Sequence, residues 1–120
     1  FILSPTADGN CEVLTRIKSN GYYLIPSTEV LENPQLEALR NAQDILNLEN
    51  VELLSYFGSK EHTHAYVLRT IGAEIQTEQM TKMGYQFTGL NVVLGTKVQS
   101  EAKAFWNQLL DYVQEHMVWD

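Results

Sequence analysis

The sequence predicts one α+β domain: a two-layer structure in which a mixed, mostly antiparallel sheet carries helices on one face, with a ferredoxin-like tendency. Two observations support this prediction. The chain has 120 residues, near the commonest size for a single domain. Short segments of strand character also alternate with segments of helical periodicity, and residues 51–117 are expected to run strand, helix, strand, strand, helix. We therefore expect a single domain over residues 1–120.

The first 25 residues are expected to form a strand, a helix and a second strand. Residues 1–3 have strand character, and Asn10 stands where it would cap a helix. Gly21 suits the left-handed conformation that often follows a helix, and residues 22–25 then form a short strand. The apolar stripe of this expected helix consists of Val13, Leu14 and Ile17.

The middle of the chain contains the clearest helix start. Asn33 precedes Pro34, a capping residue followed by proline at the first helical position, and the apolar spacing continues to about residue 47. Residues 51–57 are expected to form a strand that ends at Gly58. Residues 60–71 fit both a helix and a strand, and we favour the helix.

The last third is expected to hold two strands and a long helix. Residues 73–79 alternate in polarity as a half-buried strand does, and residues 85–94 form a more apolar strand suited to a central position. Thr96 and Gln99 have the spacing of a capping box at the start of the final helix. Its expected apolar stripe consists of Val98, Ala102, Phe105, Trp106, Leu109, Leu110, Val113 and Met117.

Charge argues against nucleic-acid binding and favours a protein partner. The net charge is −7, and the eight basic residues are scattered, so neither nucleic acid nor an anionic membrane is an expected partner. Residues 29–52 contain six acids and one base, a net charge of −5. We interpret this segment as a docking surface for a basic protein, in the manner of an inhibitor, immunity or regulatory protein. The proposed contact residues are Glu29, Glu32, Glu37, Asp44, Glu49, Glu52 and Trp119.

An alternative interpretation is a small-ligand or metal-binding domain, with enzymatic activity left open. His62 and His64 are two residues apart, a spacing that lets two imidazoles share a metal on a strand but not on a helix. Gly58, Ser59 and Lys60 would join a strand to the expected helix, whose free N–H groups could hold an anion. A third alternative is self-association through an exposed apolar face of the last helix.

No familiar catalytic or cofactor motif is present, so no cofactor is predicted and no catalytic residue is assigned. Cys11 is the only cysteine, which excludes an intrachain disulfide and favours a reducing, cytoplasmic compartment. Its expected place at a helix start would lower the pKa of the thiol, although a structural or incidental cysteine is the favoured interpretation.

One partial resemblance also favours a binding protein. The segments 12–22 and 56–59, with the helix expected up to Gly72, resemble the regulator of ribonuclease E activity type B family over about half of the chain. The resemblance implies a ferredoxin-like fold and binding of a ribonuclease without catalysis. Residues 27–50 would be an insertion, and only residues 118–120 correspond to that family's terminal aromatic-Asp-Gly-Trp pattern.

Overall fold

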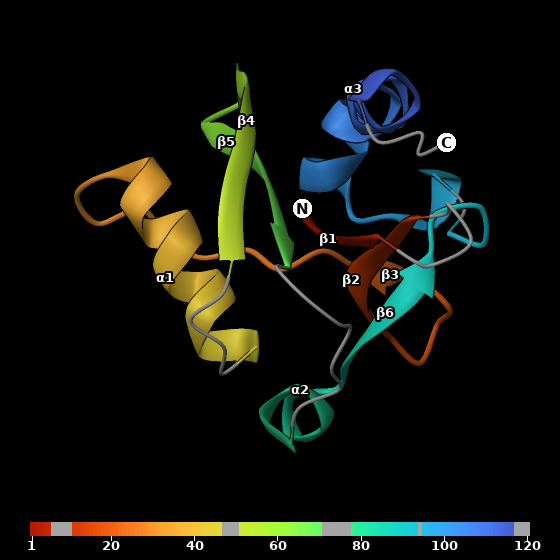
Figure 1. Ribbon diagram of the computed structural model, residues 1–120. Coiled ribbons are helices and arrows are strands. Elements are labelled where there is room, and N and C mark those ends of the chain that lie inside the picture. The colour runs from red at the N-terminus through yellow and green to blue at the C-terminus, as the bar shows by residue number, and fades with distance from the viewer. Residues whose placement is uncertain (6–10, 47–50, 71–77, 94, 117–120) are drawn as a thin grey trace.

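The computed structural model describes residues 1–5, 11–46, 51–70, 78–93 and 95–116 (Figure 1). Its strands are β1 (Ile2–Pro5), β2 (Cys11–Ile17), β3 (Tyr23–Leu24), β4 (Val51–Lys60), β5 (Thr63–Thr70) and β6 (Tyr85–Gly89). Its helices are α1 (Pro34–Leu46), α2 (Glu78–Met83) and α3 (Ser100–His116), and a short 3-10 turn, η1 (Gly95–Lys97), precedes α3.

The six strands form one mixed sheet in the order β3-β2-β1-β5-β4, with β6 pairing to β2. The pairing of β1 with β5 is parallel, and the other four pairings are antiparallel. The predicted α+β class with a mixed, mostly antiparallel sheet is therefore confirmed. Strand β1 lies inside the sheet, between β2 and β5.

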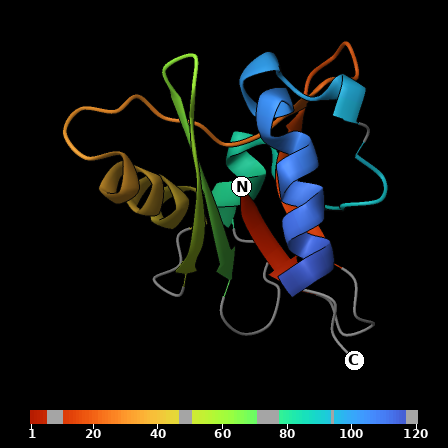
Figure 2. The ribbon, with the colours of Figure 1, turned by 90° about the horizontal axis from the view of Figure 1, so that it is seen from above.

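Helices α1 and α3 lie on opposite sides of the β4–β5 hairpin (Figures 1 and 2). Helix α2 is on the same side of the sheet as α1, because its Met80 belongs to the same buried cluster as Ala42 of α1. The buried residues form two clusters, one on each side of the sheet. The cluster under α3 includes Leu3, Val13, Val67 and Phe105. The cluster on the α1 and α2 side is built around Ile2, Leu14, Ala42, Leu68 and Met80.

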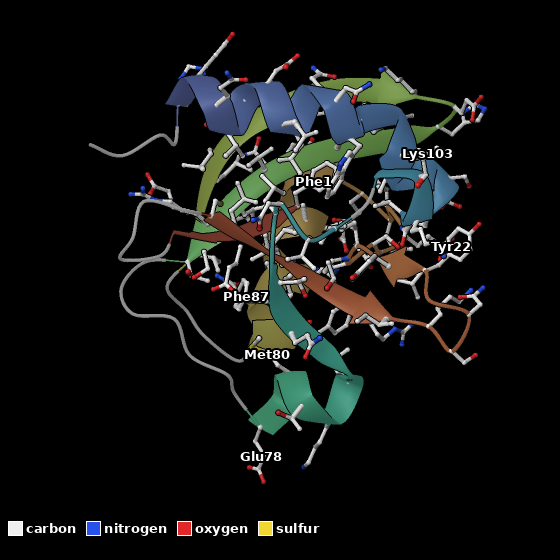
Figure 3. The ribbon with its side chains drawn as sticks, turned by 90° about the vertical axis from the view of Figure 1, so that its right-hand side faces the viewer. Phe1, Tyr22, Glu78, Met80, Phe87 and Lys103 are labelled. Carbon is white, nitrogen blue, oxygen red and sulfur yellow. The ribbon has the colours of Figure 1, made fainter. Side chains whose placement is uncertain are left out.

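Alternation along β1 explains how one strand serves both clusters. Successive side chains of a strand point to opposite faces, so Ile2 enters the α1 side and Leu3 enters the α3 side. Figure 3 shows Phe1 close to α3, while Met80 points from α2 toward the sheet and Glu78 points away from it. A strand that is apolar on both faces is expected of an interior position.

The start of α1 confirms the sequence prediction. The Asn33 side chain accepts a hydrogen bond from the Leu36 amide at 3.1 Å, and its carbonyl accepts one from the Glu37 amide at 3.0 Å. Pro34 occupies the first helical position, where its missing N–H is no loss.

The helix expected after Asn10 is wrong: residues 11–17 form β2. Cys11, Val13 and Thr15 alternate along one face of that strand, and its two sides pair with β1 and β6. Over so short a stretch, the spacing of Val13, Leu14 and Ile17 fits a strand as well as a helix. Pairing with β6, which is about seventy residues away in the chain, decides in favour of the strand.

The helix favoured for residues 60–71 is also wrong. Strand β4 continues through Gly58 to Lys60, the chain reverses at Glu61 and His62, and β5 follows. Glu61 and His62 have positive φ values of 49° and 66°, the conformation of a two-residue type I′ hairpin turn. Asn-Gly or Asp-Gly usually marks such a turn, so the sequence carries no signal for it.

Three further expectations need correction. Of the strand expected over residues 73–79, Glu78 and Gln79 begin α2, and the remainder lies outside the described residues. Strand β6 ends at Gly89, not Leu94, and in the described part of the chain it pairs with β2 alone, so it is not central. Helix α3 begins at Ser100, later than the predicted Thr96 cap.

The predicted stripe of α3 is largely confirmed. Ala102, Phe105, Trp106 and Leu109 are buried, whereas Leu110 is 37% exposed. None of the helices in the described part of the chain has the length and apolar run that a bilayer-spanning segment requires.

Replacing the capping residue should destabilise the domain. We expect Asn33→Ala to lower the free energy of unfolding by about 1 kcal/mol, because the Leu36 amide loses its acceptor. Urea denaturation followed by circular dichroism measures this. The exposed Asn107→Ala on α3 is the control and should change stability by less than about 0.5 kcal/mol. Equal stability of both variants would contradict the assignment of the cap.

Candidate functional site

A cleft of about 850 Å³ opens where β1 begins. Strands β5 and β2 flank β1. The cleft is lined by β5, by the segment that follows β3, by the first turns of α1 and by the start of α3.

An aromatic wall forms the β5 side of the cleft. His64 and Tyr66 line it, and Tyr56 on the neighbouring strand β4 contacts both rings. The Tyr56 ring stacks on that of Tyr66 with centroids 4.7 Å apart and on that of His64 with centroids 6.0 Å apart. The Tyr56 hydroxyl is also 2.8 Å from Nδ1 of His64, within hydrogen-bonding distance. Burial raises the pKa of Tyr66, and the charge of Tyr56 adds to this effect.

Gln99 fixes the opposite wall. Its side-chain carbonyl accepts a hydrogen bond from the Ile25 backbone N–H at 2.8 Å, and the backbone N–H of Gln99 donates one to the Tyr23 carbonyl at 3.2 Å. Its backbone carbonyl accepts from the amides of Ala102 and Lys103 in the first turn of α3. One residue thus joins the end of β3 to the start of α3. The predicted Thr96–Gln99 capping box is not seen, because the Gln99 side chain serves this link instead.

The charged groups of the cleft carry both signs. Arg16 and Lys18 line it, and the Arg16 guanidinium carbon lies 5.8 Å from the centre of the Tyr85 ring. Three carboxylates also line it: Glu29, Glu37 and Glu101. Because Glu37 is buried and pairs with Arg40 at 3.6 Å, Glu29 and Glu101 remain to balance the two bases.

The structure brings together some of the sequence-predicted ligand residues and separates the others. His62 and His64 both line the cleft. Gly58, Ser59 and Lys60 belong to β4, and no helix follows them, so the predicted anion site at a helix start is wrong. The Lys60 ammonium donates to the Ala104 carbonyl at 3.1 Å and lies 5.1 Å from the centre of the Phe105 ring.

The described acids of residues 29–52 differ in exposure and in partners. Glu29, Glu32 and Asp44 are exposed, whereas Glu37 is buried. Glu52 lies on β4 and accepts a hydrogen bond from Arg69 at 3.0 Å. The remaining members of the predicted surface, Glu49 and Trp119, lie outside the described residues.

Sequence reasoning missed Tyr56, Tyr66 and Gln99 as residues of the site. Tyr56 and Tyr66 are directly opposed across the β4–β5 hairpin, and only the register of that hairpin reveals the pair. The spacing of His64, Tyr66 and Leu68, which are two residues apart, is the signal in the sequence that indicates a strand. In the part of the chain that the structure describes, no group of three or more histidine, cysteine or acidic side chains is arranged to hold a metal ion.

Cys11 is an inert thiol. It lies on β2 with 6% of its surface exposed, and burial raises the pKa of the thiol to about 11, with the nearby Glu12 carboxylate adding to the effect. The activated cysteine considered for a helix start is therefore wrong, because Cys11 lies on a strand and burial raises the pKa of its thiol.

The fold matches a solved structure of known class. No protein-family model matches the chain, and no curated protein matches it in sequence. In three dimensions the chain is similar to a Nudix hydrolase from M. smegmatis, RenU, with a TM-score of 0.63. The match covers 98% of this chain and 84% of that chain at 15% sequence identity. It defines a fold shared with a hydrolase.

This similarity overturns the main functional interpretation of the sequence. A non-enzymatic acidic protein that docks on a basic partner conflicts with a fold that matches an enzyme along nearly its whole length. Within the acidic segment, Glu37 and Glu52 each pair with an arginine of the same chain. The alternative interpretation, a ligand-binding domain that uses His62 and His64, fits the structure better.

The buried thiol gives a direct test of the β2 assignment. At pH 8 we expect Ellman's reagent to label Cys11 at least about a hundredfold more slowly in the folded chain than in urea, because the folded thiol is both buried and protonated. Absorbance of the released thionitrobenzoate measures the rate. Fast labelling of the folded chain would contradict the buried strand position.

Proposed function

We propose that this chain is a small-ligand binding domain whose ligand lies in the cleft beside His62 and His64. The observation that carries the proposal is the cleft itself, about 850 Å³ in volume and lined by aromatic rings and by charged side chains of both signs. Clefts of this size are typical of small-ligand sites. The single cysteine supports a reducing compartment, the cytoplasm, as the place of action.

The chemistry of the walls supports binding. Planar rings line one side, and two bases and two free acids offer hydrogen bonds and charge to a polar ligand. Such a mixture of apolar surface and a few convergent polar groups is the usual composition of a ligand site. Tyr56 holds the His64 ring through its hydroxyl and its ring face, which preorganises the wall.

Hydrolysis of the bound ligand is a second candidate function, supported by the similarity to RenU, which is a Nudix hydrolase. His64 is a group in the cleft suited to proton transfer, and it is the one held by a second side chain. Its Nδ1 is engaged by Tyr56, which leaves Nε2 to accept a proton from an attacking water or to donate one to a leaving group.

Ligand binding should appear as thermal stabilisation. A screen of nucleotides and sugar phosphates at millimolar concentration should contain at least one compound that raises the Tm, because a ligand at about one hundred times its Kd stabilises the folded state by roughly 2.7 kcal/mol. We expect Ala38→Trp, which places an indole in the cleft, to abolish the shift. The control Gln114→Trp, at an exposed position of α3, should keep it.

A shift that survives in Ala38→Trp would place binding elsewhere, and a flat screen would count against small-molecule binding at the cleft.

Hydrolysis has its own test. If a compound that binds is turned over, His64→Gln should lower kcat by about a hundredfold, because general acid–base catalysis contributes factors of about 10² to 10⁴. Release of product from the compound, followed by chromatography, measures kcat. His116→Gln, an exposed histidine near the end of α3, is the matched control and should keep full activity. Equal rates in both variants would contradict the role of His64.

A further inference from the structure

A second hollow lies between α3 and the turn that follows β6, and Figure 2 shows the chain after β6 running beside that helix. The volume of the hollow is about 640 Å³. It shares no lining residue with the cleft, so it is a separate site. Three parts of the chain line it: the turn, η1 through Thr96, and one stripe of α3.

Backbone hydrogen bonds hold the turn after β6 in one shape. The Gly89 carbonyl accepts from the amides of Val92 at 2.9 Å and Val93 at 3.3 Å. The Leu90 amide donates to the Cys11 carbonyl on β2 at 3.0 Å. Leu90 and Val93 both line the hollow, so this wall is fixed before a ligand arrives.

The opposite wall is a stripe of α3 that consists of Lys103, Trp106, Asn107 and Leu110. Residues three and four positions apart lie on the same side of a helix, so these side chains are neighbours. The rise of an α-helix makes the stripe about 10 Å long. Trp106 and Val93 are both 5% exposed and therefore form the bottom of the hollow, whereas Leu110 is 37% exposed and stands at its edge.

Apolar side chains also reach solvent around the hollow. Val92, which is 56% exposed, lies between two lining residues of the turn, and Leu110 faces it from the helix wall. Covering these side chains together with the apolar bottom would remove a continuous apolar surface from water, which favours an occupant with an apolar chain.

Lys103 gives the hollow one positive charge. Among its described lining residues no other is charged, although the net charge of the chain is −7. None of the ion pairs in the described part of the chain includes Lys103. Lys103 lies near the start of α3 (Figure 3), and Leu110 is at the far end of the stripe. Side chains that can donate hydrogen bonds, Asn91, Thr96 and Asn107, complete the lining.

We propose that this hollow binds a small monocarboxylate with an unbranched apolar chain. The carboxylate pairs with the Lys103 ammonium, and the chain lies along the stripe over Trp106 toward Leu110. One ammonium matches one carboxylate, whereas the net negative charge of the protein repels ligands with several negative charges. Extended octanoate has about the length of the stripe. The site is independent of the proposed function of the cleft.

An NMR titration of the full chain with octanoate tests the proposal. We expect the indole N–H of Trp106 and the side-chain amide of Asn107 to shift and to saturate with a Kd of about 1 mM. The backbone amide of Tyr66, in the cleft, should keep its position. Hexanoate should bind about tenfold more weakly, because it lacks two methylene groups. Shifts confined to the cleft, or no saturable shift of Trp106, would overturn the proposal.

Charge reversal tests the role of Lys103. We expect Lys103→Glu to weaken octanoate binding about tenfold and to strengthen binding of octylamine, which carries the opposite charge. Lys82→Glu is the matched control: it makes the same change of net charge at an exposed position of α2, so both Kd values should stay the same. Equal effects of the two variants would overturn the proposal, as would octylamine binding to the parent chain as tightly as octanoate does.

Discussion

The pairing of β1 with β2 on one side and β5 on the other is the constraint on which the rest of the structure depends. Leu3 lies opposite Val13 in the antiparallel pair, and Ile2 lies opposite Leu68 in the parallel pair. These side chains are buried on both faces of the sheet, so a short strand holds together the core under α3 and the core against α1 and α2. Its loss would separate the β4–β5 hairpin from the other strands.

The cleft has two walls with different partners. One wall is formed by β5, and the other by the segment that follows β3 together with the start of α3. The β5 wall is backed by Tyr56 from β4, and the β3 wall is tied to α3 through Gln99. Both walls are thus supported from behind, which suits a site that must hold its shape before a ligand arrives.

Local signals in the sequence predicted some of this arrangement. Asn33-Pro34 indicated the start of α1, and the apolar stripe of α3 identified most of its buried residues, because capping and helical periodicity are properties of neighbouring residues. The α+β class followed from the mixture of periodicities.

The remainder depends on contacts between distant residues. The pairing of β2 with β6 overrides a helical spacing near Leu14, and the hairpin at Glu61 and His62 lacks the usual glycine or asparagine. A helix over residues 60–71 would point His62 and His64 in nearly opposite directions, and it gives no indication of the wall that His64 forms with Tyr66. The negative charge of residues 29–52 can be counted from the sequence. The sequence does not show that Glu37 is buried or that Glu52, on β4, pairs with Arg69.

The most direct test of the cleft is a crystal of this chain soaked with a library of small fragments. The account predicts electron density for bound compounds between His64 and Ile25. Density confined to another hollow, such as the one beside Trp106 and Leu90, or an empty cleft across the whole library, would contradict it.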